Sequence, residues 1–204
     1  MKKQSDFRVM LKEALILFAI TLISGLVLGF VHELTKEPIL KQEEKAVQEA
    51  CKAVFADASA FELYDYDLAD YFIEELNDMG VKPGKVFLAK DSAGECMGFV
   101  IETTTTRGYG GNIVIYSGIT TSLSCKDISI LSISETPGLG MQAEKVLVPQ
   151  FHNKTADRFE YTKTGARADN EIDAISGATI TTKAVTNAVN GALMIAEEVK
   201  GGVQ

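Results

Sequence analysis

The chain contains few of the residues that build metal centres and disulfide frameworks. Three cysteines, Cys51, Cys96 and Cys125, lie far apart without a C-x-x-C pair, and neither His32 nor His152 has a suitably spaced carboxylate or cysteine partner. Iron–sulfur and zinc sites need clustered ligands, so neither kind of site is encoded. An odd number of cysteines excludes a fully paired disulfide framework, although Cys96 and Cys125 could bridge in an oxidising compartment.

Positive charge is also scarce. The 204 residues include 20 Lys and Arg against 28 Asp and Glu, which gives a formal net charge of -8. Such a surface repels a phosphate backbone, so we expect no nucleic-acid partner. Hydrophobic residues make up 46% of the chain and charged residues 24%, close to the globular average, so a packed core is expected. The length suits one domain with an appendage, and no internal repeat is present.

One long apolar run lies near the N-terminus. Residues 14–31 read ALILFAITLISGLVLGFV, which is 18 residues without a charge. As a helix the run spans roughly 27 Å of a hydrocarbon core about 30 Å thick. A buried core helix or a cleaved signal peptide would also be apolar, but the run is long for either, and no A-x-A-like cleavage site follows it. The pattern predicts a transmembrane helix at residues 14–31.

Charge around this run predicts its direction. Four basic residues, Lys2, Lys3, Arg8 and Lys12, precede it within residues 1–13. The positive-inside rule therefore places the N-terminus in the cytoplasm and the rest of the chain on the far side of the cell (inner) membrane.

Beyond the membrane we expect a helical stalk and one domain. The stalk is predicted at residues 32–60, where a helix follows Pro38 and apolar residues recur at seven-residue intervals. Residues 61–204 would form the domain, beginning with an acidic segment, residues 61–79, of weak helical periodicity.

Strand-like segments dominate the middle of this domain. KVFLAK, CMGFVIETTTT, NIVIYSGIT and KDISILSIS are rich in Val, Ile, Thr and aromatic residues and are separated by glycine turns. They predict an antiparallel sheet. Residues 142–148 and 183–199 are expected to be helical, the latter with an apolar stripe. The fold class is therefore α+β.

The segment with most chemical content is DAISGAT, residues 173–179. A small-residue turn before a capped helix would look similar. However, Gly177 and Ala178 leave the Thr179 hydroxyl open to a bulky group, and a helix beginning near Thr181 would direct its N–H groups and positive dipole end at a phosphate. Ser176 and the hydroxyls of the helix start could donate further hydrogen bonds.

The pattern D-x-x-[ST]-G-A-T resembles the acceptor sequence of proteins that carry covalent flavin mononucleotide (FMN). In those proteins a flavin transferase, using FAD as donor, attaches FMN through a phosphoester to the final threonine. The resemblance implies Thr179 as the attachment residue.

A second segment, ETPGLG at residues 135–140, would alone be an ordinary turn after a strand. Together with DAISGAT it resembles the flavin-ring segment of the Rnf complex G subunit and of the C subunit of the Na⁺-translocating NADH:quinone oxidoreductase. A third, RGYGG at residues 107–111, fits that family's glycine-rich turn, where Tyr109 would stack near the ring; a hairpin turn with a surface tyrosine is the alternative.

The resemblance covers almost the whole chain, and the length favours the Rnf G subunit over its longer relative. It implies a membrane-anchored electron carrier in an ion-translocating ferredoxin:NAD⁺ oxidoreductase complex, with other membrane subunits and a flavin transferase as partners. A non-redox binding module and a stand-alone extracytoplasmic reductase are the rival hypotheses. Besides Thr179, the implied cofactor-binding residues are Tyr109, Glu135, Thr136, Pro137, Gly138, Leu139, Gly140, Ser176, Gly177, Ala178, Thr181 and Thr182.

Overall fold

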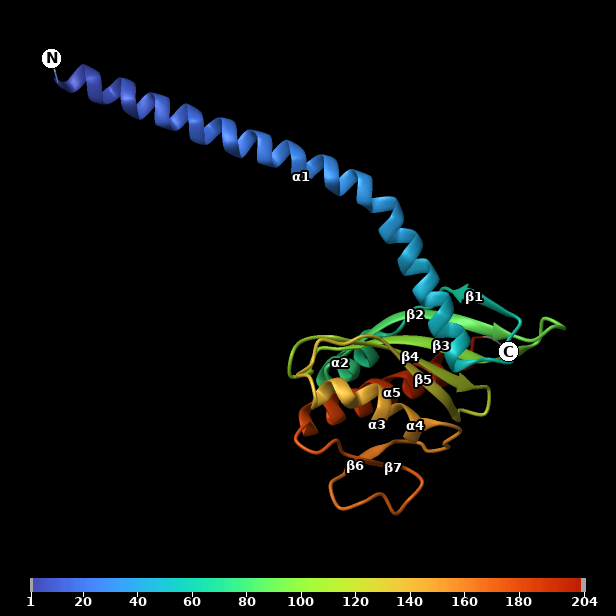
Figure 1. Cartoon of the computed structure of the whole chain (residues 1–204). Helices are drawn as coiled ribbons and strands as arrows, with labels where there is room; N and C mark the ends of the chain where they lie inside the picture. The colour runs from blue at the N-terminus through green and yellow to red at the C-terminus, as the bar shows by residue number, and fades with distance from the viewer. Residues whose placement is uncertain (1, 203–204) are drawn as a thin grey trace. The chain divides into compact units, whose positions relative to one another are not determined.

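The computed structural model describes residues 2–202, with side chains from residue 8 onward (Figure 1). The chain divides into two compact units, Met1–Lys45 and Ala46–Gln204. Helix α1 spans Lys2–Val54 and contains the predicted transmembrane segment. Its most apolar window has a mean hydropathy of 2.7 and is not buried within the protein, so among the described residues this helix is long and apolar enough to cross a membrane.

A helix was expected to continue outward from the membrane with Pro38 in a first turn, and Pro38 lies inside the continuous helix α1. A proline removes one backbone hydrogen bond from a helix without preventing the helix from continuing when the flanking residues favour it. Here the flanking residues include several strong helix formers, such as the LKQEEKA run that follows. The helix is therefore continuous through the predicted start of the stalk.

The second unit is built on one antiparallel sheet, as predicted from the strand-like segments. Five strands pair in the order β1-β2-β3-β4-β5. Their bounds are Ala60–Tyr64 for β1, Val81–Lys90 for β2, Cys96–Thr105 for β3, Ile113–Thr120 for β4 and Cys125–Ser132 for β5. A small parallel pair, β6 at Glu160–Thr162 and β7 at Glu171–Asp173, lies outside this sheet. The α+β prediction is confirmed.

Two sequence expectations near the start of this unit were incomplete. The weak helical periodicity of segment 61–79 corresponds to helix α2 at Asp70–Met79, but the first part of the segment belongs to β1, which pairs with β2. Strand β2 begins at Val81, before the predicted KVFLAK, and a register shift between Pro83 and Val86 interrupts its pairing with β3. This irregularity accommodates Pro83, which has no N–H to donate to a ladder.

The predicted helix at 142–148 is divided into three short pieces. They are a 3₁₀ turn at Gly140–Gln142, α3 at Ala143–Val146 and α4 at Val148–Phe151. Pro149 stands in the first turn of α4, where its missing N–H is tolerated but where it cannot continue the hydrogen bonding of α3. The last helix, α5, covers Thr179–Lys200 and so begins two residues before the expected start near Thr181.

Both faces of the sheet are covered. On one face α5 and α2 enclose the main core, with apolar residues of β2 to β5. On the other, the last turn of α1 and Phe55 pack against Ala89, Val100 and Tyr116. Gly98 makes room there, since a Cβ at this position would lie 2.7 Å from the Phe55 ring and 2.3 Å from the Ile119 carbonyl oxygen.

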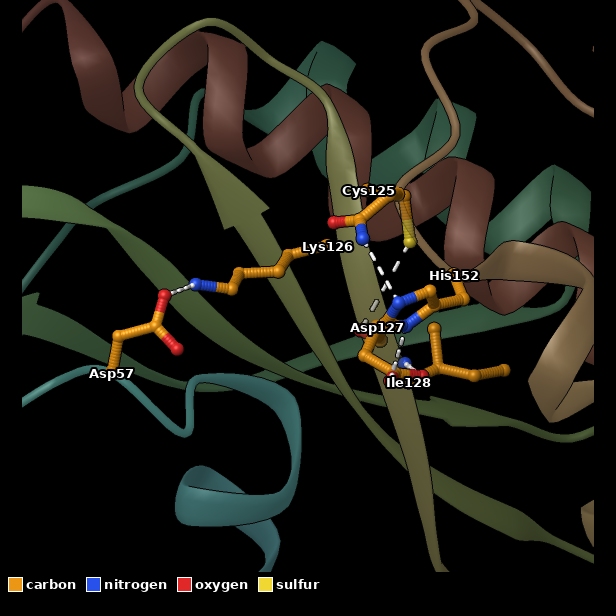
Figure 2. A network of polar contacts seen from close by, with 7 residues as sticks. Asp57, Cys125, Lys126, Asp127, Ile128 and His152 are labelled. Carbon is orange, nitrogen blue, oxygen red and sulfur yellow. Dashed lines mark hydrogen bonds and ion pairs between the residues drawn. The ribbon is translucent and has the colours of Figure 1, made fainter.

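Strand β5 also fastens two loops to the sheet (Figure 2). Lys126 forms an ion pair with Asp57 and lies 4.8 Å from the centre of the Phe55 ring, while Asp127 Oδ2 lies 2.9 Å from His152 Nδ1. Cys125 at the start of the strand is fully buried, and this burial, with the nearby Asp127, raises the pKa of its thiol to about 12. The network fixes the ends of α1 and α4 against β5.

Candidate cofactor site

Three segments that are distant in the sequence meet around one cavity of about 440 Å³. The β3–β4 loop contributes Tyr109, and the segment after β5 contributes Glu135, Thr136, Leu139 and Gly140. The start of α5 contributes residues 177–181. A cavity of this size is within the usual range of roughly 300–1,000 Å³ for sites that hold small molecules and cofactors.

Thr179 is the first residue of α5, and the helix start is not capped by a side chain. The first helical backbone bond is donated by the Thr182 N–H to the Ala178 carbonyl at 3.0 Å. Earlier N–H groups of the helix have no intrahelical acceptor, so they and the positive end of the helix dipole favour an anion at this point. The half-exposed Thr179 hydroxyl therefore stands at a position suited to a phosphate.

Leu139 and Gly177 bring the ETPGLG and DAISGAT segments into contact. A Cβ at Gly177 would lie 3.0 Å from Leu139 Cδ2, and Gly177 has a φ of 76°, which only glycine adopts without strain. The carbonyl of Thr136 accepts backbone N–H groups from Leu139 at 3.1 Å and from Met141 at 3.2 Å, which closes the turn. Leu139 thus supplies an apolar wall next to the helix start.

Glu135 joins all three segments. Its side chain is only 7% exposed. Oε1 accepts the backbone N–H of Gly110 at 3.1 Å, and Oε2 accepts the Thr181 hydroxyl at 2.8 Å. The RGYGG loop, the segment after β5 and the start of α5 are therefore held together by one carboxylate.

The structure brings most of the predicted site residues to the cavity but not all of them. Pro137 and Gly138 lie in the turn without lining it, and Ser176 is exposed beside it. Thr182 is buried, donating its hydroxyl to the Ala178 carbonyl at 3.0 Å and accepting the Ile175 N–H at 3.1 Å. Its hydroxyl is engaged in forming the helix start.

Ile180 lines the cavity and was not among the predicted residues. Its side chain is 54% exposed although it is large and apolar. An apolar residue directly after Thr179 was visible in the sequence, but one such residue is ordinary in a helix, so only the fold distinguishes it. With Leu139 and Tyr109 it gives the cavity an apolar and aromatic rim.

These residues fit FMN in three respects. The volume suits a flavin ring, the apolar and aromatic groups offer it van der Waals contact, and the uncapped helix start with its free hydroxyl suits the phosphate. Chemically, the arrangement can hold a flavin ring against a polar floor formed by Glu135 and Thr181.

Family comparisons agree with this geometry. Residues 108–194 match the FMN-binding domain, and residues 1–54 match the RnfG N-terminal region. The FMN-binding domain match includes every residue that lines the cavity, and the RnfG N-terminal match covers helix α1. The chain is thus an FMN-binding domain protein with an N-terminal membrane helix.

Similar proteins extend over nearly the full length. The G subunit of the Na⁺-translocating ferredoxin:NAD⁺ oxidoreductase complex of Acetobacterium woodii is 32% identical over 95% of this chain and 95% of its own. The G subunit of the proton-translocating complex of Clostridium ljungdahlii is 31% identical over 88% of each chain. A crystal structure of Shewanella oneidensis NqrC is 19% identical, with a TM-score of 0.48 over 70% of this chain and 81% of that one. On the sequence relatives, the chain belongs to the G-subunit family of ion-translocating (Rnf) oxidoreductase complexes.

Proposed function

We propose that this chain is the membrane-anchored electron-transfer subunit of an Rnf-type ferredoxin:NAD⁺ oxidoreductase and carries FMN through a phosphoester on Thr179. The single observation that carries the proposal is the place of Thr179. It is the first residue of α5 and lines the same cavity as the ETPGLG segment, 40 residues earlier in the chain. If the DAISGAT motif matched by coincidence, there would be no reason for it to lie beside the ETPGLG segment.

Each part of the cavity has a task in this proposal. The backbone N–H groups at the start of α5 hold the phosphate that remains charged after esterification. Leu139, Ile180 and Tyr109 exclude water from the ring and restrict its orientation. When bound, the flavin supplies one-electron and two-electron transfer, which no amino-acid side chain of the cavity provides.

Partners follow from the relatives, which are named as subunits of ion-translocating complexes. We expect the chain to pass electrons between other membrane subunits of such a complex rather than to bind ferredoxin or NAD⁺ itself. A covalent bond suits a carrier beyond the cytoplasmic membrane, because a loosely held flavin dissociates where free FMN is scarce. A flavin transferase acting in the same compartment would form the bond.

The test compares full-length wild type, Thr179→Ala and Thr164→Ala, each produced in a membrane together with a flavin transferase directed to the envelope. Thr164 is the matched control, since it is an exposed threonine outside both the DAISGAT segment and the cavity. Intact mass and visible absorbance are measured after denaturation. We expect a yellow FMN adduct in wild type and Thr164→Ala, and none in Thr179→Ala.

Two results would contradict the proposal. Equal flavin in wild type and Thr179→Ala would place the attachment elsewhere in the chain. Colourless protein in all three variants, with a transferase shown to modify another acceptor in the same cells, would remove covalent FMN and leave a non-redox module as the better hypothesis.

A further inference from the structure

The cavity contains a buried carboxylate without a cation. Glu135 is 93% buried, and in the part of the chain that the structure describes no Lys, Arg or His forms an ion pair with it. Its partners are a backbone N–H, from Gly110, and a hydroxyl, from Thr181. Buried carboxylates in proteins are usually paired with a cation, because removing the charge from water is unfavourable.

The chain is shaped to hold this side chain in place. A Cβ at Gly108 would lie 2.7 Å from Glu135 Oε1, and a Cβ at Gly140 would lie 2.7 Å from Oε2 and 2.6 Å from Thr181 Oγ1. Backbone from two segments therefore closes against both carboxylate oxygens. The carboxylate cannot turn away to the solvent without moving the RGYGG loop or the turn after β5.

The carboxylate also faces the cavity, which it lines together with Thr181. Two acceptor bonds leave unused lone pairs on a carboxylate, which has about four acceptor positions. A fixed negative charge at the floor of this cavity acts through protein rather than water. At the effective dielectric constant of a protein interior, an interaction between two charges is roughly four times stronger than in water.

We propose that Glu135 sets the reduction potential of the flavin by placing beside it a negative charge that forms no ion pair among the described residues. The inference rests on the proposed function, which puts FMN in this cavity. One electron, delivered by the preceding carrier of the complex, adds one negative charge to the ring until a proton follows from solvent. The negative charge of the carboxylate opposes that added charge, so it lowers the potential; no bond to the carboxylate forms or breaks.

The same feature suits a relay. A low potential keeps an electron from being trapped at this carrier, and a charge held by backbone contacts on both oxygens does not relax when the electron arrives. Glu135 thereby acts in two ways, joining the three segments and tuning the group they hold. Only the second effect changes a potential, which makes the two separable.

The decisive variant is Glu135→Gln in the full-length, flavin-loaded protein. Glutamine keeps the shape, and its amide can accept from the Gly110 N–H and donate to the Thr181 hydroxyl, while the charge is lost. Glu135→Asp keeps the charge. Glu144→Gln is the matched control, because Glu144 is an exposed acid in the first turn of α3. Flavin content is measured by mass, and the potential by spectroelectrochemical titration.

We expect Glu135→Gln to favour reduction at least tenfold in the one-electron equilibrium, which corresponds to a rise of about 59 mV. Glu135→Asp and Glu144→Gln should remain close to wild type. If Glu135→Gln fails to fold, Thr181→Val provides the measurement: it removes one of the two donors, exposes more of the charge to the ring and should lower the potential.

Failure of this inference is distinct from failure of the proposed function. Loaded Glu135→Gln with the wild-type potential, or Thr181→Val with an unchanged or higher potential, overturns the tuning role and leaves the flavin site intact. A wild-type chain that takes up no flavin beside an active transferase overturns the flavin site, and the tuning role with it.

Discussion

Substitution of Gly110 by alanine should lower the free energy of unfolding by about 2–4 kcal/mol, although the change adds only one methyl group. A Cβ at this position would lie 1.9 Å from the Ser134 carbonyl oxygen and 3.0 Å from the Ser134 carbonyl carbon. Both atoms belong to the backbone, so no rotation of a side chain relieves the clash. The RGYGG loop must move away from the segment after β5.

Two contributions make up the expected loss. Forcing an extra carbon into a packed site costs about 1–3 kcal/mol. Moving the loop also lengthens the bond from the Gly110 N–H to Glu135, now 3.1 Å, and hydrogen bonds to charged groups contribute about 1.5–3 kcal/mol. Both contributions arise from the same movement of the loop and therefore do not add fully. The expected total loss of unfolding free energy is about 2–4 kcal/mol.

Thermal unfolding of the full chain in detergent measures the effect. The chain has no Trp and six Tyr, so tyrosine fluorescence or near-ultraviolet circular dichroism reports on packing. For a protein of this size 1 kcal/mol changes Tm by about 2–4 °C, so Gly110→Ala should unfold at least about 4 °C below wild type.

Gly201→Ala is the matched control for this measurement. Its φ of −62° suits alanine, and the nearest atom to a new Cβ is an ordinary 3.5 Å away. This variant should unfold at the wild-type temperature. Equal Tm values for the two alanine variants would refute the argument that the loop is held against the segment after β5.

Two further predictions concern the support of α5 and the direction of the chain. Asn190 is 96% buried, and its side-chain amide bonds the backbone N–H and the carbonyl of Phe159 at 2.8 and 2.9 Å. Asn190→Leu leaves both backbone groups unpaired and should lower the free energy of unfolding by about 2–5 kcal/mol. The change is measured as a shift of the denaturant midpoint. An unchanged midpoint would show that water replaces the amide. If the domain lies outside the cytoplasm, alkaline phosphatase fused to the C-terminus should be active, and green fluorescent protein fused there should not fluoresce. An inactive phosphatase fusion and a fluorescent green fluorescent protein fusion would place the domain in the cytoplasm.

The sequence was most informative where a pattern is local. An uncharged run of apolar residues, strands rich in Val, Ile, Thr and aromatic residues, and an apolar helical stripe each depend on residues a few positions apart, and the structure has the long apolar helix, the sheet and the last helix. Strand β1, at the start of segment 61–79, was missed for a related reason: this five-residue strand owes its structure to pairing with β2, which lies some twenty residues later. Short strands are determined by their partners more than by their own residues.

Site residues divide in the same way. That a helix begins close to Thr179 could be inferred from small residues followed by an apolar stripe, although the start was expected two residues later. That Thr182 supports the helix start while Thr181 contacts Glu135 could not, because adjacent hydroxyls look alike in sequence and differ only in which side of the helix each faces. No local pattern shows that the Glu135 side chain is buried, because its burial depends on close packing of Gly108 and Gly140 against it.

The DAISGAT segment alone therefore does not make the candidate site. Thr179 and its neighbours belong to one segment, but the walls and floor come from residues 109 and 135–140, held to the α5 start through Glu135. A transferase needs an accessible hydroxyl, whereas a carrier needs a ring that is shielded and held in one orientation. In the proposed function, attachment and tuning thus depend on different parts of the molecule, and we expect a substitution in the RGYGG loop to disturb tuning while leaving attachment at Thr179 intact.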